Sequence, residues 1–389
     1  MNAPQKIDDT RSHIEVVPVM DKAQRRAFVR MPWNVYRDDP NWIPPLLLER
    51  EGHIDPKQNP FFDHAEVQLW IAYQEGQAVG RISAQVDQAF LERHQEKTGH
   101  FGFLDAIDDP AVFKALIETA ENWLRSRGMT KIVGPLSFSM NDEVGLLVEG
   151  FEYPPSLMMG HAFPYYASSL EALGFTKAVD TIAYDFDVNK DGLDKKARAI
   201  VNRLSANPKV TVRSLNKSNF ENELRIVIDI FNDAWHDNWG FVPINEAEIK
   251  KLASDFKLLL DPELVSIIEV DGEPAAFGLT IPNINEAIRD LNGRLLPFGW
   301  VKFIYRILTK KIRSARLPFM GVRRKYQKSW MGAAMCLIII DMVHSRNVGQ
   351  KDKAELSWVL EENVGVRKII ESTGCKPYKT YRVFEKALV

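Results

Sequence analysis

The sequence is poor in the residues and segments that build several common classes of protein. It has only two cysteines, Cys336 and Cys375, among 389 residues, which excludes a disulfide framework and indicates a reducing compartment. No C-x-x-C or H-x-x-x-H spacing occurs, so the sequence predicts no metal site. The first residues lack the apolar core of a secretory signal, and the longest apolar runs, such as MGAAMCLIII, are about half the roughly 20 residues of a membrane span. These absences predict a soluble cytoplasmic protein.

Charge is distributed unevenly along the chain. The net charge is −2, but residues 294–328 contain eleven Lys and Arg and no Asp or Glu, which leaves −13 (−2 minus 11) for the remainder. A basic segment in an otherwise acidic protein favours a local anionic partner over nucleic acid. The alternative is a solvated helix face followed by a loop.

The order of the predicted helices and strands repeats along the chain. In each half a strand and a helix precede a hairpin, and a helix, a strand and a second helix lead to a final strand. The second half has one more predicted strand, LPFMGV, directly after its hairpin. The hairpin glycine Gly76 lies 98 residues before the helix-end glycine Gly174, and Gly272 lies 102 residues before Gly374. The sequence therefore predicts two tandem α+β lobes, 14–187 and 209–389, joined by a linker at 188–208.

The segment VRRKYQKSWMGAAM, residues 322–335, predicts an anion site. A predicted strand, LPFMGV, leads into this basic segment, and an apolar helix follows it. Backbone N–H groups in the first turn of a helix have no partner within the helix and favour a phosphate. Small residues such as Gly332 and Ala333 allow a phosphate to approach the backbone.

This segment resembles the acetyl-CoA diphosphate loop of the GNAT acyltransferase superfamily, V-x-x-x-x-[QR]-x-x-G-x-[GA]. Val322 opens the pattern and Gln327 takes the Gln/Arg place, whereas Trp330 stands at the first glycine and Gly332 at the second small position. The resemblance covers 209–389 and recurs in degenerate form over 14–187. It implies a mixed α/β fold of two GNAT-like lobes, each with a mostly antiparallel sheet flanked by helices, and one acyl-CoA site in the second lobe. The residues implied to bind acyl-CoA are Met320, Gly321, Val322, Arg324, Gln327, Lys328, Ser329, Gly332, Ala333 and Asn363.

Three further segments resemble the tandem GNAT subfamily that includes bacterial ceramide synthases. They are SMNDEVGLLVEGFEYPPSLMMGHAFPYY (139–166), AWHDNWGFVP (234–243) and LTIPNINEAIRDLNGRLLPFGW (279–300). The resemblance implies transfer of a fatty acyl group from acyl-CoA to the amine of a sphingoid base, by direct attack of the amine on the thioester. Trp239 and Asn283 in these segments are candidate substrate residues.

Residues 294–316 form an insert with the pattern of a basic amphipathic helix. Lys302, Arg306, Lys310 and Arg313 share one face, and Trp300 lies among the apolar residues of another. Such a helix is typical of proteins that bind an anionic membrane surface from one side. The alternative is that the apolar face packs on the second lobe.

Four residues are candidates for proton transfer to or from the reacting groups. His236 has a suitable intrinsic pKa, two neighbouring tryptophans would partly desolvate it, and Asp237 could orient it or act itself. Glu361 is a rival base, and Tyr381 could replace the general acid that many superfamily members carry at the position of Ile370. For each residue, a capping or solvated role is the alternative. Further candidates that could reach across from the first lobe are Asn141, Asp142, Glu143 and His161.

Two other classes of function share the doubled architecture or the acyl-CoA loop. Aminoacyl-tRNA-dependent transferases have tandem GNAT lobes, but they need a broad basic surface, whereas the basic segment here is local. A non-catalytic acyl-CoA or lipid-binding protein is favoured by the departures at Trp330 and Ile370.

Overall fold

The computed structural model describes residues 13–256, 261–309, 311–347 and 351–388. The first-half strands are β1 (Ile14–Pro18), β2 (Ala65–Gln74), β3 (Gln77–Asp87), β4 (Thr98–Ala106), β5 (Lys131–Gly134), β6 (Leu136–Ser137), β7 (Glu143–Val144), β8 (Leu146–Glu149) and β9 (Thr176–Asp187). The second-half strands are β10 (Val210–Ser214), β11 (Val265–Val270), β12 (Glu273–Pro282), β13 (Ser314–Val322), β14 (Lys353–Leu360) and β15 (Lys376–Ala387).

Helices connect these strands in both halves. The first half contains α1 (Lys22–Arg30), α2 (Pro32–Val35), α3 (Leu47–His53), α4 (Gln88–His94), α5 (Pro110–Arg125) and α6 (Tyr165–Ala172). After α7 (Lys195–Ser205), in the predicted linker, the second half contains α8 (Phe220–Ala234), α9 (Glu246–Phe256), α10 (Asn285–Ile288), α11 (Gly299–Leu308), α12 (Arg324–Gln327), α13 (Trp330–Asn347) and α14 (Val364–Glu371).

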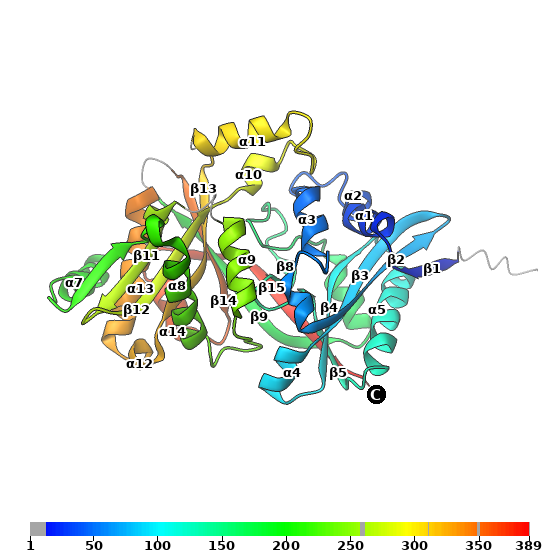
Figure 1. Cartoon of the computed structure of the whole chain (residues 1–389), viewed down its shortest axis with the longest axis horizontal. Coiled ribbons are helices and arrows are strands. Elements are labelled where there is room, and N and C mark those ends of the chain that lie inside the picture. The colour runs from blue at the N-terminus through cyan, green and yellow to red at the C-terminus, as the bar shows by residue number, and fades with distance from the viewer. Residues whose placement is uncertain (1–12, 257–260, 310, 348–350, 389) are drawn as a thin grey trace, which may run out of the picture.

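One sheet runs through both halves, in the order β1-β2-β3-β4-β5-β15-β9-β14-β13-β12-β11-β10 (Figure 1). Neighbouring strands in this order are antiparallel, apart from the parallel pairs β4–β5 and β13–β14. Each half gives its last strand to the other, because β9 pairs with β14, and β15 pairs with β5. The two exchanged strands pair with each other at the centre of the sheet. The predicted lobe boundaries stay a prediction, since these strands belong to one half by sequence and to the other by pairing.

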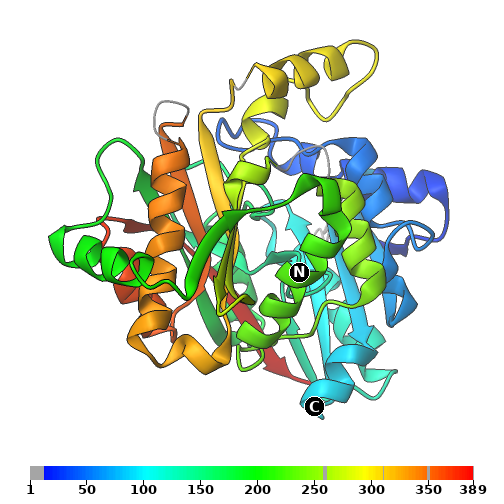
Figure 2. The same ribbon diagram turned by 60° about the vertical axis from the view of Figure 1, so that its left-hand side comes forward.

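Helices cover the sheet on both faces. In the second half, α7, α13 and α14 lie on one face, and α8 and α9 lie on the other (Figures 1 and 2). The apolar helix α13 is central to the first of these layers, where Ala334, Met335 and Ile340 are fully buried. In the first half, α5 packs its buried face on β3.

The segment with α10 and α11 connects β12 to β13 and rests on the first half. Ile288 and Leu291 form one apolar cluster with Ile43, and the Leu47 N–H donates to the Gly293 carbonyl at 3.0 Å. This segment therefore bridges the two halves above the centre of the molecule (Figure 1).

Candidate functional site

The strands β13 and β14 diverge and open a gap in the second-half sheet. Their parallel pairing stops at Leu317 and Leu356, after which β13 pairs only with β12 and β14 only with β9. Trp235 and Trp358 pack edge to face at this gap, with ring centroids 5.1 Å apart. The Trp235 indole N–H donates to the carbonyl of Met320 at 3.0 Å. Residues 320–322, which are predicted to bind acyl-CoA, therefore lie on the diverging part of β13.

A tight loop follows β13 and leads through α12 into α13. Gly332 lies so close to this loop that a Cβ atom there would overlap the carbonyl oxygen of Tyr326. The Ser329 hydroxyl donates to the same carbonyl at 2.7 Å and accepts from the Gly332 N–H at 3.2 Å. The Gln327 amide donates to two carbonyl oxygens, at 2.8 and 2.9 Å. The predicted side-chain donors Gln327 and Ser329 therefore hold the loop itself together.

The charges around this loop are largely paired within the protein. Arg323, Arg324 and Lys325 form ion pairs with Asp229, Asp233 and Glu273. Lys328 is exposed, and Ala333 is half-buried with its N–H donating to the Ser329 carbonyl at 3.3 Å. The Trp330 residue is 45% exposed, and the Arg203 guanidinium of α7 lies over its ring, 4.5 Å from the centroid.

The four predicted proton-transfer residues lie in different surroundings. His236 and Asp237 are at the surface, with side chains 45% and 77% exposed, and His236 Nδ1 is 2.7 Å from Asp237. The expected desolvation of His236 by its neighbouring tryptophans is therefore incomplete. Glu361 forms an ion pair with Lys177 at 2.7 Å. Tyr381 is fully buried, its hydroxyl has no partner among the described residues, and burial raises its pKa well above the usual value.

Asn363 and Asn283 both make local hydrogen bonds. Asn363 caps α14 by accepting from the Val366 N–H at 3.3 Å. Asn283 accepts from the Leu157 N–H of the first half at 3.1 Å, which ties the β12 end to the other half. Trp239 is half-buried against a cluster that includes Met140 of the first half.

A cavity of about 610 Å³ lies between the two halves. Its apolar lining includes Ile43, Leu46, Leu157, Met159, Ile288, Leu295 and Phe319. Phe319 lies on the diverging part of β13, so the cavity reaches this part of the strand.

The polar part of the cavity wall comes mainly from the first half. Asn141, Asp142, Glu143 and His161, which the sequence offered as residues that could reach across, all line it. Arg50, which sequence reasoning missed, forms an ion pair with Glu143. Burial would raise the pKa of Glu143, but the charge and hydrogen bond of Arg50 lower it, whereas burial raises the pKa of Asp142.

The equivalent strands of the first half diverge as well. The β4–β5 pairing stops at His100 and Val133, as it does in β13–β14. A Cβ atom at Gly102 would overlap the Leu136 carbonyl, to which the Gln85 amide donates at 2.8 Å. Beyond this contact, Phe103 of β4 and Ser137 of β6 line the cavity between the halves.

A buried polar cluster beside the gap was not predicted. Arg316, Glu355 and Lys379 are 2%, 4% and 1% exposed. Arg316 lies 3.5 Å from Glu355, and the Lys379 ammonium donates to the Pro154 carbonyl at 2.7 Å. The sequence did contain a signal for this cluster, because Arg316 and Glu355 each stand within a predicted apolar strand, in the segments ARLPF and AELSW.

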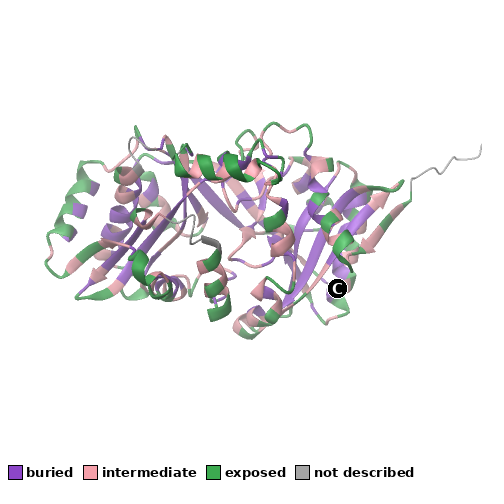
Figure 3. Ribbon diagram, turned by 45° about the horizontal axis from the view of Figure 1, so that its top comes forward, coloured by how far each residue is buried: buried purple, intermediate pink, exposed green. Residues whose placement is uncertain are grey.

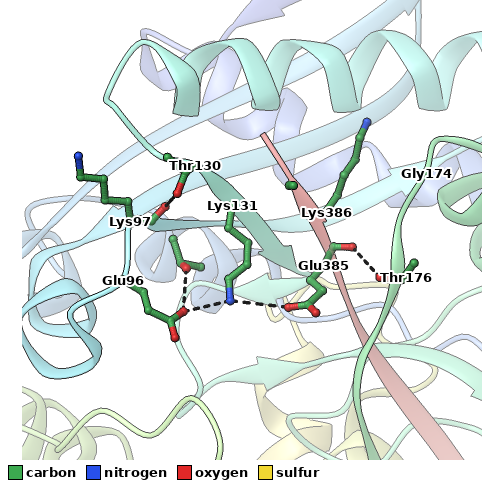
Figure 4. Close-up of a pocket in the computed structure, with 10 residues that line it drawn as sticks. Glu96, Lys97, Thr130, Lys131, Gly174, Thr176, Glu385 and Lys386 are labelled. Atoms are coloured by element: carbon green, nitrogen blue, oxygen red, sulfur yellow. Dashed lines mark hydrogen bonds and ion pairs between the residues drawn. The ribbon is translucent and has the colours of Figure 1, made fainter. Parts of the chain in front are cut away.

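A second pocket, of about 560 Å³, lies between β4, β5 and β15 (Figure 4). Lys131 at its centre forms ion pairs with Glu96 at 3.0 Å and with Glu385 at 3.7 Å. It lies far from the β13–β14 gap in the fold, and its central charges neutralise one another, so it is a weaker candidate.

Most of helix α11 is exposed (Figure 3), and many of its exposed residues are apolar. They are, with the preceding loop, Leu296, Phe298, Trp300, Val301, Ile304, Tyr305 and Leu308, and we call them the α11 patch. Phe303 instead packs toward the Ile43 cluster. Arg306 chelates Asp290 and its hydrogen bond lowers the pKa of that carboxyl to about 2, while Lys302 is 3.7 Å from the same residue. Arg313 pairs with Asp352, and Lys310 lies outside the described residues.

The described ranges hold no group of three His, Cys, Asp or Glu side chains that could bind a metal ion. Nor do they contain a helix with the length and apolar character that crossing a membrane requires.

Comparisons with known proteins identify relatives over the whole chain. The chain is 45% identical over 385 residues to the bacterial ceramide synthase of Caulobacter vibrioides, covering 98% of this chain and 99% of that protein. It is 44% identical over 370 residues to protein YghO of Escherichia coli, covering 95% and 94%. No family model matches the chain.

Solved structures share the arrangement of helices and strands. A tandem GNAT protein from the clavulanic acid biosynthesis pathway matches with a TM-score of 0.57 and 12% identity, covering 97% of this chain and 99% of that one. A GCN5-related N-acetyltransferase from Sphaerobacter thermophilus matches with a TM-score of 0.52 and 12% identity, covering 96% of each chain. At this identity the likeness concerns the fold alone, and it confirms the predicted mixed α/β fold of two GNAT-like lobes.

Proposed function

We propose, from the premise that this chain belongs to the family of the Caulobacter bacterial ceramide synthase, that it transfers a fatty acyl group from acyl-CoA to the amine of a long-chain, sphingoid-type base. The chain is an acyltransferase with the tandem GNAT fold, as its sequence predicted. The nature of the acceptor and the course of the reaction are the proposal.

The observation that carries the proposal is the cavity between the halves. An acceptor with a long alkyl chain needs apolar surface, and burial of each methylene contributes about 0.8 kcal/mol. The apolar lining from Ile43 to Phe319 offers such surface and ends at the diverging part of β13. In this arrangement the amine of the acceptor lies at the gap, while its chain lies in the cavity.

The acyl-CoA is proposed to enter at the start of α13. Free N–H groups in the first turn of a helix favour the diphosphate, and Lys328 adds an exposed positive charge. The thioester then lies at the diverging part of β13, where backbone N–H groups of 320–322 polarise its carbonyl.

The chemistry proposed is a direct transfer. The neutral amine attacks the thioester carbon, the C–N bond forms and the C–S bond breaks, and CoA leaves as the thiol once it gains the proton that the nitrogen loses. No covalent enzyme intermediate is needed, and burial raises the pKa of Cys336 and Cys375 to about 12, which disfavours a thiolate nucleophile. For the proton that the attacking nitrogen loses, the base we propose is His236 paired with Asp237, which lies on the α12 side of the gap.

Mass spectrometry of a defined reaction tests this function. We expect the purified chain, incubated with palmitoyl-CoA and sphinganine, to form N-palmitoyl sphinganine and free CoA in equal amounts. N-acetyl sphinganine, whose nitrogen is blocked, should give no product. Release of CoA without an amide product, or no reaction with any long-chain amine, would contradict the proposal.

We further propose that the α11 patch contacts an anionic membrane surface, from which a lipid acceptor reaches the cavity. Monomeric proteins rarely expose so many neighbouring large apolar side chains without a binding partner. Lys302 is 62% exposed on the same helix, and a basic residue near an anionic leaflet contributes about 1 kcal/mol. Leu295, adjacent to the patch, lines the cavity, as does the 76% exposed Leu48 of α3.

Co-sedimentation with vesicles tests the membrane contact. We expect wild-type protein to sediment with vesicles that contain phosphatidylglycerol, and the double variant Trp300→Glu/Leu308→Glu to stay largely in the supernatant. Both side chains are exposed in the free protein, at 47% and 76%, so folding should be unaffected. Met20→Glu is the matched control, since Met20 is 73% exposed next to β1. Equal sedimentation of the double variant and wild type would refute the contact.

A further inference from the structure

Asp142 in the cavity wall has an incomplete set of partners. Its Oδ2 accepts hydrogen bonds from the Ser139 hydroxyl at 2.8 Å and from the Ser139 N–H at 3.3 Å. Its Oδ1 has no hydrogen bond with any described residue, and no Lys or Arg in the described ranges forms an ion pair with this carboxylate. The side chain keeps accessible surface because it faces the cavity.

The other carboxylates nearby already have a cation. Glu143 pairs with Arg50, and Glu248 lies 3.4 Å from His64. Hydrogen bonds to Asp87 and Glu248 raise the pKa of His64 to about 10, so this imidazole is positively charged at neutral pH. Asp142 therefore has no ion-pair partner among the described residues; burial raises its pKa from the usual value, and the charge of the nearby His53 offsets only part of this. A desolvated carboxylate without a cation strongly favours binding one.

A second polar group in the same wall also has no partner. The His161 side chain is 4% exposed, its Nε2 is 2.7 Å from Asp39, and its Nδ1 has no hydrogen bond in the described part of the chain. With Nε2 donating to the carboxylate, Nδ1 is an acceptor, which a hydroxyl or ammonium group of a ligand in the cavity would satisfy on entry.

Asp142 lies in a loop that contacts the second half near the gap between β13 and β14. Met140, two residues earlier, is buried in one cluster with Leu360, the last residue of β14. The Asn141 amide donates to the Val242 carbonyl of the second half at 3.4 Å. The β6–β7 hairpin thus holds the carboxylate against the second half, beside the end of the cavity that reaches the diverging part of β13.

We propose that Asp142 binds the ammonium group of a long-chain amine and so selects the acceptor. This inference rests on the proposed function, and it assigns a role to the first half. The ligand is an alkylammonium rather than a metal ion, because one carboxylate without an ion-pair partner, in a cavity with a largely apolar lining, matches one positive charge on an apolar chain. An uncharged lipid of the same length would leave the carboxylate unpaired, so it should bind more weakly.

Calorimetry with two probes that differ in charge tests the site. We expect the wild-type chain to bind decylamine about tenfold or more tighter than decanol, because hydrogen bonds to charged groups are worth more than neutral ones. Asp142→Asn, which can still accept from Ser139, should bind the two probes about equally and keep its affinity for CoA. In turnover assays it should raise KM for sphinganine and leave KM for palmitoyl-CoA unchanged. Asp271→Asn, at an exposed hairpin turn, is the matched control and should keep the preference for the amine.

The outcomes separate this inference from the proposed function. If wild type binds both probes alike, or if Asp142→Asn keeps the preference for the amine, the inference is wrong even when acyl transfer occurs. If wild type prefers the amine but forms no N-acyl product with any long-chain amine, the site stands and the proposed function fails. The wild-type comparison needs no variant, so a folding defect in Asp142→Asn would not leave the question open.

Discussion

Glu355→Gln should lower the free energy of unfolding by about 3–5 kcal/mol, the usual cost of removing one partner from a buried ion pair. Within the described ranges, Glu355 is the one buried carboxylate of its cluster, and it faces the two buried cations Arg316 and Lys379. Burial would raise the pKa of Glu355, but the charges of Lys379 and Arg316 lower it overall. A neutral amide would leave both cations in the interior without a counter-charge.

This cluster also joins the two halves of the molecule. Glu355 on β14 accepts from the hydroxyl of Ser156 in the first half at 2.8 Å, and from the Tyr378 hydroxyl on β15. Arg316 on β13 donates to the first-half carbonyl of Leu157 at 2.6 Å. Loss of the central charge should therefore weaken the contact between halves as well as the pairing within the sheet.

Urea unfolding followed by circular dichroism measures this effect. Glu246→Gln is the matched control, because Glu246 forms an exposed ion pair with Arg225 at 2.7 Å, and exposed pairs contribute little. The control should unfold at the wild-type urea concentration. A Glu355→Gln variant as stable as the control would show that the cluster is not held by charge.

Local patterns in the sequence predicted most elements because each pattern has one dominant cause. The predicted helix MGAAMCLIIIDMVHSR corresponds to α13, since a long apolar run between two polar loops leaves no other compact structure. The predicted turn at Asp271-Gly272 joins β11 to β12, and both residues have positive φ, which Gly tolerates and Asp tolerates better than most. By contrast β4 was missed, because all nine of its residues are buried and its sequence shows no alternation of apolar and polar side chains.

The exchange of β9 and β15 could not be predicted from the sequence. Both strands end a repeat and follow a short helix, so their local patterns are alike. Which neighbours they choose is decided by contacts between residues about 200 positions apart, such as the pair Thr181 and Tyr381. Periodicity carries no information about such contacts.

The sequence marked individual polar residues but not how they lie relative to one another. The polar NDE segment stood out in an apolar stretch, and the structure places it in the cavity wall. The sequence also marked His236 by its aromatic neighbours, but the direction of its ring depends on how α8 ends at Ala234 and on the nearby Arg324. Side-chain direction at a helix end follows from tertiary packing, which the local pattern does not contain.

Gly332→Ala should weaken the binding of CoA about a hundredfold while leaving the fold intact. A Cβ atom at this position would overlap the Tyr326 carbonyl oxygen and lie 3.1 Å from the Cα of Gln327. The backbone of α12 would have to move away from α13, which breaks the Ser329 hydrogen bonds that join them. The N–H groups proposed to bind the diphosphate would lose their common direction, and two charge-assisted hydrogen bonds of about 1.5 kcal/mol each correspond to that factor.

Calorimetric titration with CoA measures the loss, and circular dichroism checks that the variant is folded. Gly365→Ala is the matched control, because no atom lies within 4 Å of its added Cβ and alanine is favoured in a helix. This control should bind CoA as the wild type does. If Gly332→Ala also binds CoA with wild-type affinity, the diphosphate does not lie at the start of α13, and the acyl-CoA must enter the β13–β14 gap by another route.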